Sequence, residues 1–458
     1  MDEPTDDLRP APLVASLRGH RRIPWRTALW PLPMAFAVGA IVAQYVTVWL
    51  DTLAREGTIS LPAVLGERTP AGVIQVTGLI AAASATALAL VVTLTVTVLA
   101  NAGQAFGQRL IRNFVRATIT KVTLGLFLAS TVFSLGVLYR TTGGPSVASP
   151  SLSTAVSVTL ALAAVVTLIL YINHVAAELQ APSVIARVAR DLWEVIEERR
   201  HDAEHGRVLH AASGDDAREA EELLAREGRA ILAGRSGYVQ SVDADVLFRA
   251  ADEANMMLRF RHRPGHFVLY HTTIAQVWPP DRAPELMDAI ERAVRVGRYR
   301  TLQQDLKFAV DQMVEVALRA LSPAINDTFT ALQCVDWLGD ALLSIADAPE
   351  PPRVHANDTG DVRLIAPVLT FHRAVEGAFD KLRQNSTRNV SVSIRILGVI
   401  ARLAPELRDP VHRAPLTAQL DMTVEGALAV TPVAADREML LDAYRAACAA
   451  LGHAPQHG

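Results

Sequence analysis

A stripe of polar side chains follows the second long apolar run of the chain, residues 72–99, and continues past its end. Its members are three, four or seven residues apart, a spacing that puts them on one face of a helix. Lipid cannot satisfy an amide side chain, so we expect this face to turn towards protein or water. The stripe consists of Thr86, Thr93, Thr97, Asn101, Gln104 and Gln108, and apolar Leu90 fills its gap.

Three arginines, Arg109, Arg112 and Arg116, follow the stripe with no acidic residue among them. A polar path that ends in a cationic mouth would favour anions if it conducts. The same residues also fit ordinary helix packing, with each threonine hydroxyl bonded back to its own helix. The pattern leaves both interpretations open.

A second polar group lies in residues 301–336. Lys307, Asp311, Glu315 and Arg319 follow one another at steps of four, which predicts a ladder of charges along one helix face. Pro323 limits this helix, and Asn326 or Asp327 is placed to cap the next one. The turn between them could bind a ligand or a neighbouring subunit, or it could be a capped helical hairpin and nothing more. The candidate residues are Asp305, Asp311, Ser322, Asn326 and Asp327.

Metal, cofactor and catalytic patterns are weak in this sequence. His201 and His205 are four residues apart, but the surrounding charges are typical of a solvated helix. Cys334 and Cys448 have no paired cysteine or histidine at zinc-ligand spacing. We find no phosphate-binding loop, nucleotide fingerprint or nucleophile elbow. We therefore predict no catalytic residues, no metal, no cofactor and no enzymatic activity.

Four long apolar runs must position these residues. They cover about residues 30–50, 72–99, 122–139 and 152–172, and none of them contains Asp, Glu, Lys or Arg. Each is long enough for a membrane-spanning helix, which needs roughly 20 apolar residues. Proton-coupled pumps and voltage sensors depend on ionisable groups inside the membrane, so their absence from the runs argues against both.

Charge indicates the orientation of the spans. Residues 1–177 contain 12 Lys+Arg and 7 Asp+Glu, and basic residues concentrate in the N-terminal tail, in the loop after the second run and after the fourth run. Basic loops stay in the cytoplasm, so we predict a multi-pass protein of the bacterial plasma membrane with both termini cytoplasmic. Residues 178–458 have a net charge of −8, which argues against general nucleic-acid binding.

The predicted fold is a mainly α membrane protein with four transmembrane helices and a cytoplasmic α+β region. A cytoplasmic tail (1–27) precedes the transmembrane domain (28–177). A charged helical connector (178–235), a small β-containing unit (236–280) and a helical cytoplasmic domain (281–458) follow it. We expect the proline-rich segment 347–363 to be a surface loop.

Several motifs resemble those of one bacterial family. They include Gln104-Ala-Phe106, Gly237-Tyr-Val-Gln240, Arg263-Pro-Gly265 and Val277-Trp-Pro279. The most distinctive match joins Gln304-Asp305 to Arg319-Ala-Leu-Ser322-Pro323-Ala-Ile-Asn326-Asp327. Over nearly its whole length the chain resembles the predicted membrane proteins called domain of unknown function 2254. That resemblance implies a plasma-membrane protein with a cytoplasmic C-terminal region, and it brings no catalytic residues.

Two functions follow as expectations, and an enzyme is a third, less favoured option for which Asp305, Asp311 and Asn326-Asp327 are the only polar cluster worth mutating. The first is an oligomeric channel or transporter-like protein, with the stripe as its path and the arginines as its inner mouth. A four-helix protomer is small for an internal pore, so this function requires a homo-oligomer. The alternative is a non-conducting membrane tether or sensor whose cytoplasmic domain binds a partner. The lipid bilayer is the one partner that both functions share.

Overall fold

The computed structural model describes residues 11–12, 29–56, 69–106, 118–142, 151–178, 181–205, 210–211 and 214–457. The chain divides into two compact units. Residues 21–184 form the membrane unit, and residues 185–458 together with the first 20 residues form the C-terminal unit.

Four helices of the membrane unit are long and apolar enough to cross a bilayer, which confirms the four predicted spans. They are α1 (Pro31–Arg55), α2 (Pro70–Phe106), α4 (Thr118–Thr142) and α5 (Ser151–Glu178). Even a helix of 25 residues, as α1 and α4 are, rises about 38 Å, more than the roughly 30 Å of a hydrocarbon core. The helices therefore extend beyond the apolar runs at their ends.

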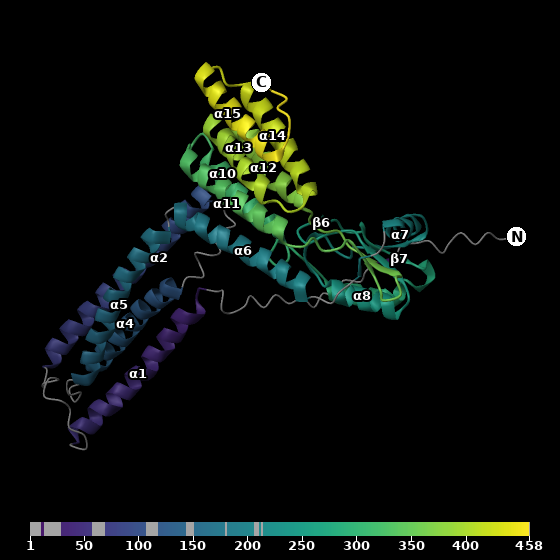
Figure 1. The fold of residues 1–458 in the computed structure, drawn as a ribbon. Helices are drawn as coiled ribbons and strands as arrows, with labels where there is room; N and C mark the ends of the chain where they lie inside the picture. Colours follow the sequence, from purple (N-terminus) through teal and green to yellow (C-terminus); the bar gives the residue numbers. More distant parts are fainter. Residues whose placement is uncertain are drawn as a thin grey trace. The chain divides into compact units, whose positions relative to one another are not determined.

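Helix α4 packs against α1, α2 and α5 (Figure 1). Small residues allow α1 to come close to it. A Cβ atom added at Gly125 would lie 2.9 Å from the ring of Phe36, and one added at Gly136 would overlap the side-chain amide of Gln44. Close approach at small residues is the usual basis of helix association in lipid, where no hydrophobic force draws helices together.

The C-terminal unit begins in α6 (Ala181–His205), an amphipathic helix whose buried side chains include Ile185, Val188 and Leu192. The Arg199 guanidinium donates a hydrogen bond of 3.1 Å to the carbonyl oxygen of Leu369, which ties α6 to the segment before α12.

Two sheets and three short helices form the first part of this unit. The larger sheet has the strand order β1-β3-β7-β5-β10-β9-β2, and the smaller has the order β6-β4-β8. The strands are β1 (Ala11–Pro12), β2 (His210–Ala211), β3 (Arg229–Leu232), β4 (Gly237–Val242), β5 (Met257–Phe260), β6 (Phe267–Val268), β7 (Thr273–Trp278), β8 (Val294–Gly297), β9 (Val354–Ala356) and β10 (Val362–Ile365). The helices are α7 (Gly214–Glu227), α8 (Ala244–Glu253) and α9 (Pro284–Ala293).

The segment 347–363 differs from the surface loop that we expected. It supplies β9 and leads into β10, which pairs in parallel with β5. All four residues of β10 are buried, so the strand has no polar–apolar alternation by which the sequence could reveal it. The prolines before β9 do lie in a loop, and their presence led us to predict a loop for the short strands that follow as well.

Six helices complete the C-terminal unit and gather in one bundle, coloured green to yellow in Figure 1. They are α10 (Leu306–Ala320), α11 (Thr328–Asp347), α12 (Phe371–Ser386), α13 (Val390–Leu403), α14 (Arg413–Leu428) and α15 (Ala434–Leu451). Asp305, Asp327, Thr370 and Asn389 each cap a helix by accepting a backbone N–H bond. The four-membrane-helix plus α+β prediction is confirmed.

Candidate anion-binding cavity

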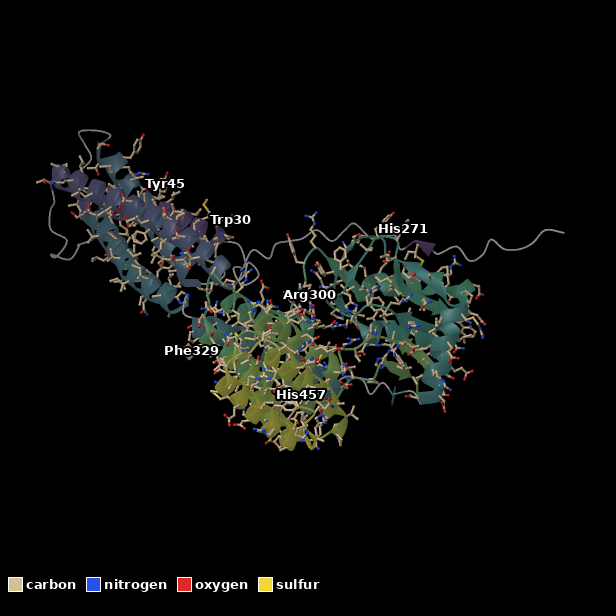
Figure 2. All side chains as sticks on the ribbon, turned by 90° about the horizontal axis from the view of Figure 1, so that it is seen from above. Trp30, Tyr45, His271, Arg300, Phe329 and His457 are labelled. Atoms are coloured by element: carbon tan, nitrogen blue, oxygen red, sulfur yellow. The ribbon has the colours of Figure 1, made fainter. Side chains whose placement is uncertain are left out.

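Arg300 joins two carboxylates at the start of α10. Its Nε and one terminal nitrogen donate to Asp305 at 2.8 and 2.9 Å, and the other terminal nitrogen donates to Asp311 at 2.9 Å. The guanidinium carbon also lies 4.8 Å from the ring centroid of Phe308. Figure 2 labels Arg300 where the strands meet the helical bundle. A planar, five-donor guanidinium suits this position because it can satisfy both carboxylates at once.

Asp305 connects this ion pair to the strands. It is the N-cap of α10, accepting from the N–H of Phe308 at 3.0 Å, and its side chain is 2% exposed. Gly265, at φ +89°, packs directly against this carboxylate, and a Cβ atom there would overlap it. Only glycine combines this backbone conformation with this contact. The motif Arg263-Pro-Gly265 therefore folds against the motif Gln304-Asp305, forty residues further along the chain.

Asp311 gathers two lysines. Lys307 Nζ donates to its Oδ1 at 2.9 Å, and Lys381 Nζ on α12 lies 3.7 Å from the same oxygen. Burial would raise the pKa of Asp311, but the bonds and charges of Lys307 and Arg300 outweigh burial and hold it below the usual value. Asp311 therefore stays ionised. We call Arg300, Asp305, Lys307, Asp311 and Lys381 the Arg300 network.

A cavity of about 610 Å³ opens beside this network, between the 263–266 turn, α10 and α12. Its size is within the range of small-molecule sites, roughly 300–1,000 Å³. Gly377 lowers its α12 wall, since a Cβ atom there would lie 3.8 Å from Lys307 Nζ. We call it the cationic cavity, and its charged and hydrogen-bonding lining includes Arg263, His266, Lys307, Arg373, Glu376, Asp380 and Lys381.

Positive charge exceeds negative charge around the cavity. Glu376 accepts from Arg373 at 2.7 Å, whereas Asp380 is 3.5 Å from Arg383, which is outside the lining. The lining itself contains four cations, Arg263, Lys307, Arg373 and Lys381, and two carboxylates, Glu376 and Asp380. Next to it, Arg300 pairs with both Asp305 and Asp311, and Arg383 lies near Asp380, so cations still exceed carboxylates by two. The side chain of Arg263 makes no hydrogen bond or ion pair with any other residue that the structure describes. An anion would compensate this excess.

The pKa values of His266 and Arg263, in the 263–266 turn, are shifted by burial and by the positive charges around the cavity. Burial, followed by the charges of Arg263 and His262, lowers the pKa of His266 to about 4. Burial also lowers the pKa of Arg263, with the neighbouring Asp305 acting in the opposite direction. A neutral imidazole next to uncompensated cations can donate or accept a hydrogen bond, and a bound anion would raise its pKa.

The five polar candidates of this region separate into two groups. Asp305 and Asp311 belong to the Arg300 network, while Ser322, Asn326 and Asp327 lie beyond the other end of α10, which is about 22 Å long. The Ser322 carbonyl accepts from the N–H of Asn326 at 2.9 Å, and Asp327 caps α11 by accepting from the N–H of Thr330 at 3.1 Å. This turn has the geometry of a capped helical hairpin.

The membrane stripe lies on the exposed face of α2. Thr86, Thr93, Thr97 and Asn101 are all exposed in the single chain. The hydroxyls of the three threonines donate to carbonyl oxygens four residues earlier, each at 2.9 Å. The backbone of Gln104 is within α2, but its side chain, Gln108 and the predicted mouth of Arg109, Arg112 and Arg116 are outside the described residues. The threonines therefore need no further partner, in lipid or in protein.

Metal binding has no candidate in the part of the chain that the structure describes, since no group of three or more His, Cys, Asp or Glu side chains could hold an ion. Cys334 is buried, and burial followed by the charge of Asp327 raises its pKa to about 12. A thiol with that pKa stays protonated and is a poor nucleophile.

Sequence reasoning missed most of the cavity. Arg300, Arg373 and Lys381 were not among the candidates, because Arg300 precedes α10 whereas Arg373 and Lys381 lie on α12, about 70 to 80 residues further along the chain. One signal was present: the chain has three lysines in all, and two of them, Lys307 and Lys381, line the cavity.

Residues 26–402 match the family described as predicted membrane protein (DUF2254). The chain belongs to the DUF2254 family. Two uncharacterized relatives, one from Mycobacterium bovis and one from Mycobacterium tuberculosis, are each 26% identical to it over 427 residues, which cover 91% of this chain and 79% of the relative. No solved structure matches it. The DUF2254 match ends within α13, so it includes every residue of the Arg300 network and the cavity lining.

Proposed function

We propose that this DUF2254 protein is a membrane-anchored sensor that binds a small anion in the cationic cavity. The observation that carries the proposal is the excess of cations around a cavity of about 610 Å³. Three separate segments, the 263–266 turn, α10 and α12, contribute to the cavity. A ligand bound there would report its presence by changing how the strands and the helical bundle contact each other.

The ion pairs of the Arg300 network hold the cations next to the cavity in place without a bound ligand. Arg300 and Lys307 are held by bonds of 2.8 to 2.9 Å, whereas Lys381 is 3.7 Å from Asp311 and its side chain is 58% exposed. Lys381 is therefore the cation that can turn to a ligand at least cost. Arg263 and Arg373 would complete a set of donors from both sides of the cavity.

Binding of inorganic phosphate and citrate to the full-length protein in detergent tests the proposal, with calorimetry as the readout. We expect Lys381→Gln to weaken binding by about tenfold, because a hydrogen bond to a charged group contributes roughly 1.5–3 kcal/mol. Arg388→Gln, at an exposed position outside the cavity, should have no effect. Equal binding by the wild type and Lys381→Gln would contradict the assignment.

A second variant fills the cavity without touching a charge. Gly377→Leu should abolish binding, because its side chain would occupy the space next to Lys307. Gly398→Leu is the matched control, since it also replaces a glycine within a helix and nothing lies within 4 Å of its added Cβ atom. Binding that survives Gly377→Leu would place the anion elsewhere.

The orientation is part of the same proposal. The arginine distribution supports a bacterial plasma-membrane protein with both termini and the C-terminal unit in the cytoplasm. Protease added outside intact cells should leave the C-terminal unit undigested, and digestion would reverse the assignment.

An oligomeric channel is the second candidate, and one observation favours it. The polar stripe on α2 is exposed in the single chain, so a ring of protomers would bring several stripes together. Purified protein in liposomes should then conduct anions, and Thr93→Val with Arg109→Ala should change flux and selectivity. Unchanged flux, or a protein that is monomeric by crosslinking in the native membrane, would remove this candidate.

A further inference from the structure

The small β6-β4-β8 sheet is built from unusually basic segments. Residues 228–242, 254–280 and 292–304 contain nine arginines and not one aspartate or glutamate. These segments supply all three strands of the sheet. Of these arginines, Arg295 lies on β8 itself, Arg298 follows that strand, and Arg235 donates a hydrogen bond to the carbonyl oxygen of Val296. The whole region 178–458 has a net charge of −8, so these arginines give the sheet a local positive charge in an acidic part of the chain.

One face of the sheet packs on a buried core, and on the other face, which we call the open face, Phe267 and Arg295 are exposed whereas Ser241, the partner of Arg295 on β4, is buried. Val239 and Val268 belong to the same buried core as Leu247 of α8 and Ile290 of α9. Along β8, Val294 and Val296 pack on that core, so Arg295 between them points to the opposite face. Tyr238 pairs with Phe267 on one side and Gly297 on the other, and it lies on this same open face.

Aromatic and aliphatic side chains border the open face. Phe267, Leu269, Tyr270 and Tyr299 are each 51–59% exposed. Contacts position two of these residues: the rings of Phe267 and Tyr238 are 4.9 Å apart, and Gln240 Nε2 donates to the backbone carbonyl oxygen of Tyr299 at 2.8 Å. Together with exposed Arg295 and Arg298 they form what we call the aromatic–arginine surface.

We propose that the aromatic–arginine surface docks on the anionic headgroups of the bilayer that the four helices span. Arginine is attracted to an anionic leaflet, and each such charge contributes about 1 kcal/mol near the surface. Tyrosine and phenylalanine bury their rings at the level of the headgroups, and Leu269 adds an aliphatic contact. Because the chain is anchored, the effective concentration of membrane is high and a weak contact suffices.

The proposal is independent of the cationic cavity, whose lining contains none of these residues. A basic surface with exposed aromatic rings can also bind single-stranded nucleic acid. Anchoring in the membrane and the presence of Leu269 favour lipid, and the experiment below separates the two.

Fluorescence quenching in nanodiscs tests the docking. Full-length Leu269→Cys protein is labelled with an environment-sensitive dye. The two native cysteines are buried, and unsubstituted protein should take up no dye. Nanodiscs contain either phosphatidylcholine alone or an equal mixture with phosphatidylglycerol, each with a shallow spin-labelled lipid quencher. We expect strong quenching only with phosphatidylglycerol, and its loss in about 1 M salt, where the Debye length is near 3 Å.

Variants and a second position complete the test. Arg295→Gln with Arg298→Gln should lower the ratio of docked to free molecules by about 25-fold, which corresponds to about 1 kcal/mol for each arginine. A dye at Met439→Cys, also exposed but on α15, should stay unquenched. No quenching at position 269 in phosphatidylglycerol would overturn the proposal. So would quenching equal at both positions, or arginine-dependent binding of a single-stranded oligoribonucleotide without lipid quenching.

Discussion

The two units of the chain differ in how their buried polar groups find hydrogen-bonding or charged partners. In the membrane unit they are mostly neutral and local: Thr77 and Thr131 donate to carbonyl oxygens of their own helices, and Ser84 meets Ser130 across α2 and α4 at 3.0 Å. In the C-terminal unit, full charges from separate elements meet around Arg300. The difference follows from the surroundings, since lipid offers a charge no relief whereas a water-facing unit can pair and partly hydrate it.

The largest expected effect is the loss of the centre of the Arg300 network. Arg300→Met leaves the nearly buried carboxylates of Asp305 and Asp311 without their main partner, which should cost about 3–5 kcal/mol of stability. The measurement is the thermal unfolding midpoint of the full-length protein in detergent, with hydrogen exchange of α10 as a local readout.

Arg402→Met is the control for this substitution. Arg402 pairs with Asp336 at 2.7 Å, but its side chain is 64% exposed and Arg395 also binds Asp336. The expected cost is at most about 1 kcal/mol. Similar losses in both variants would show that the network is no more than a surface ion pair.

The second effect concerns the contact between Gly265 and Asp305. Gly265→Ala forces a Cβ atom onto the carboxylate, and overpacking of this kind costs about 1–3 kcal/mol beyond the backbone strain. Gly360→Ala provides the strain alone, because Gly360 has φ +90° and nothing within 4 Å of its added Cβ atom. The difference between the two unfolding midpoints isolates the contact, and a difference of zero would refute it.

The contacts of Arg300 and Gly265 differ from the four spans in how far the sequence could predict them. The four spans were readable because a run of apolar residues is a local signal. The Arg300 network was readable in part: Asp305 and Asp311 were candidates, but Lys381 joins them only when α12 packs beside α10. The 263–266 turn and Asp305 were recognised as separate motifs of one resemblance. That they touch is a fact of tertiary structure, and no spacing along the chain encodes it.

The third prediction concerns Asp51, a buried acidic side chain of the membrane unit that caps the start of α5. Its carboxylate accepts from the N–H groups of Leu152 and Ser153 at 3.0 and 3.1 Å, and from the Ser153 hydroxyl at 2.6 Å. Asp51→Ala should cost about 1–2 kcal/mol, the usual value of a lost helix cap. Thr52→Ala, at an exposed neighbour, should be neutral, and equal midpoints in the two variants would contradict the capping role.

The fourth prediction concerns acid, which should weaken the charged network of the C-terminal unit. The pKa of Asp311 in the folded protein is below its ordinary value of 3.8. Its ionisation therefore contributes stability that is complete above that value and is lost as the pH falls through it towards the folded pKa. Between about pH 5 and pH 3, the unfolding midpoint of the wild type should fall further than that of Asp311→Asn. Asp442→Asn, in an exposed pair with Arg445, should behave as the wild type does, and parallel curves for all three would exclude the linkage.

The prediction with the smallest expected effect concerns a hydrogen bond between two helices of the membrane unit. Ser84→Ala removes the bond to Ser130, and hydrogen bonds between membrane helices average about 0.6 kcal/mol. Thr86→Val, two residues along α2, removes a hydroxyl that is bonded only to its own helix at Ala82 and faces outward. In a monomer it should change the unfolding midpoint in mild detergent hardly at all. If Thr86→Val instead costs as much as Ser84→Ala, and only at protein concentrations where the chain self-associates, then the stripe packs against a second copy. That outcome would support the channel over the sensor, because a stripe that faces lipid makes no contact with a second copy that the substitution could remove.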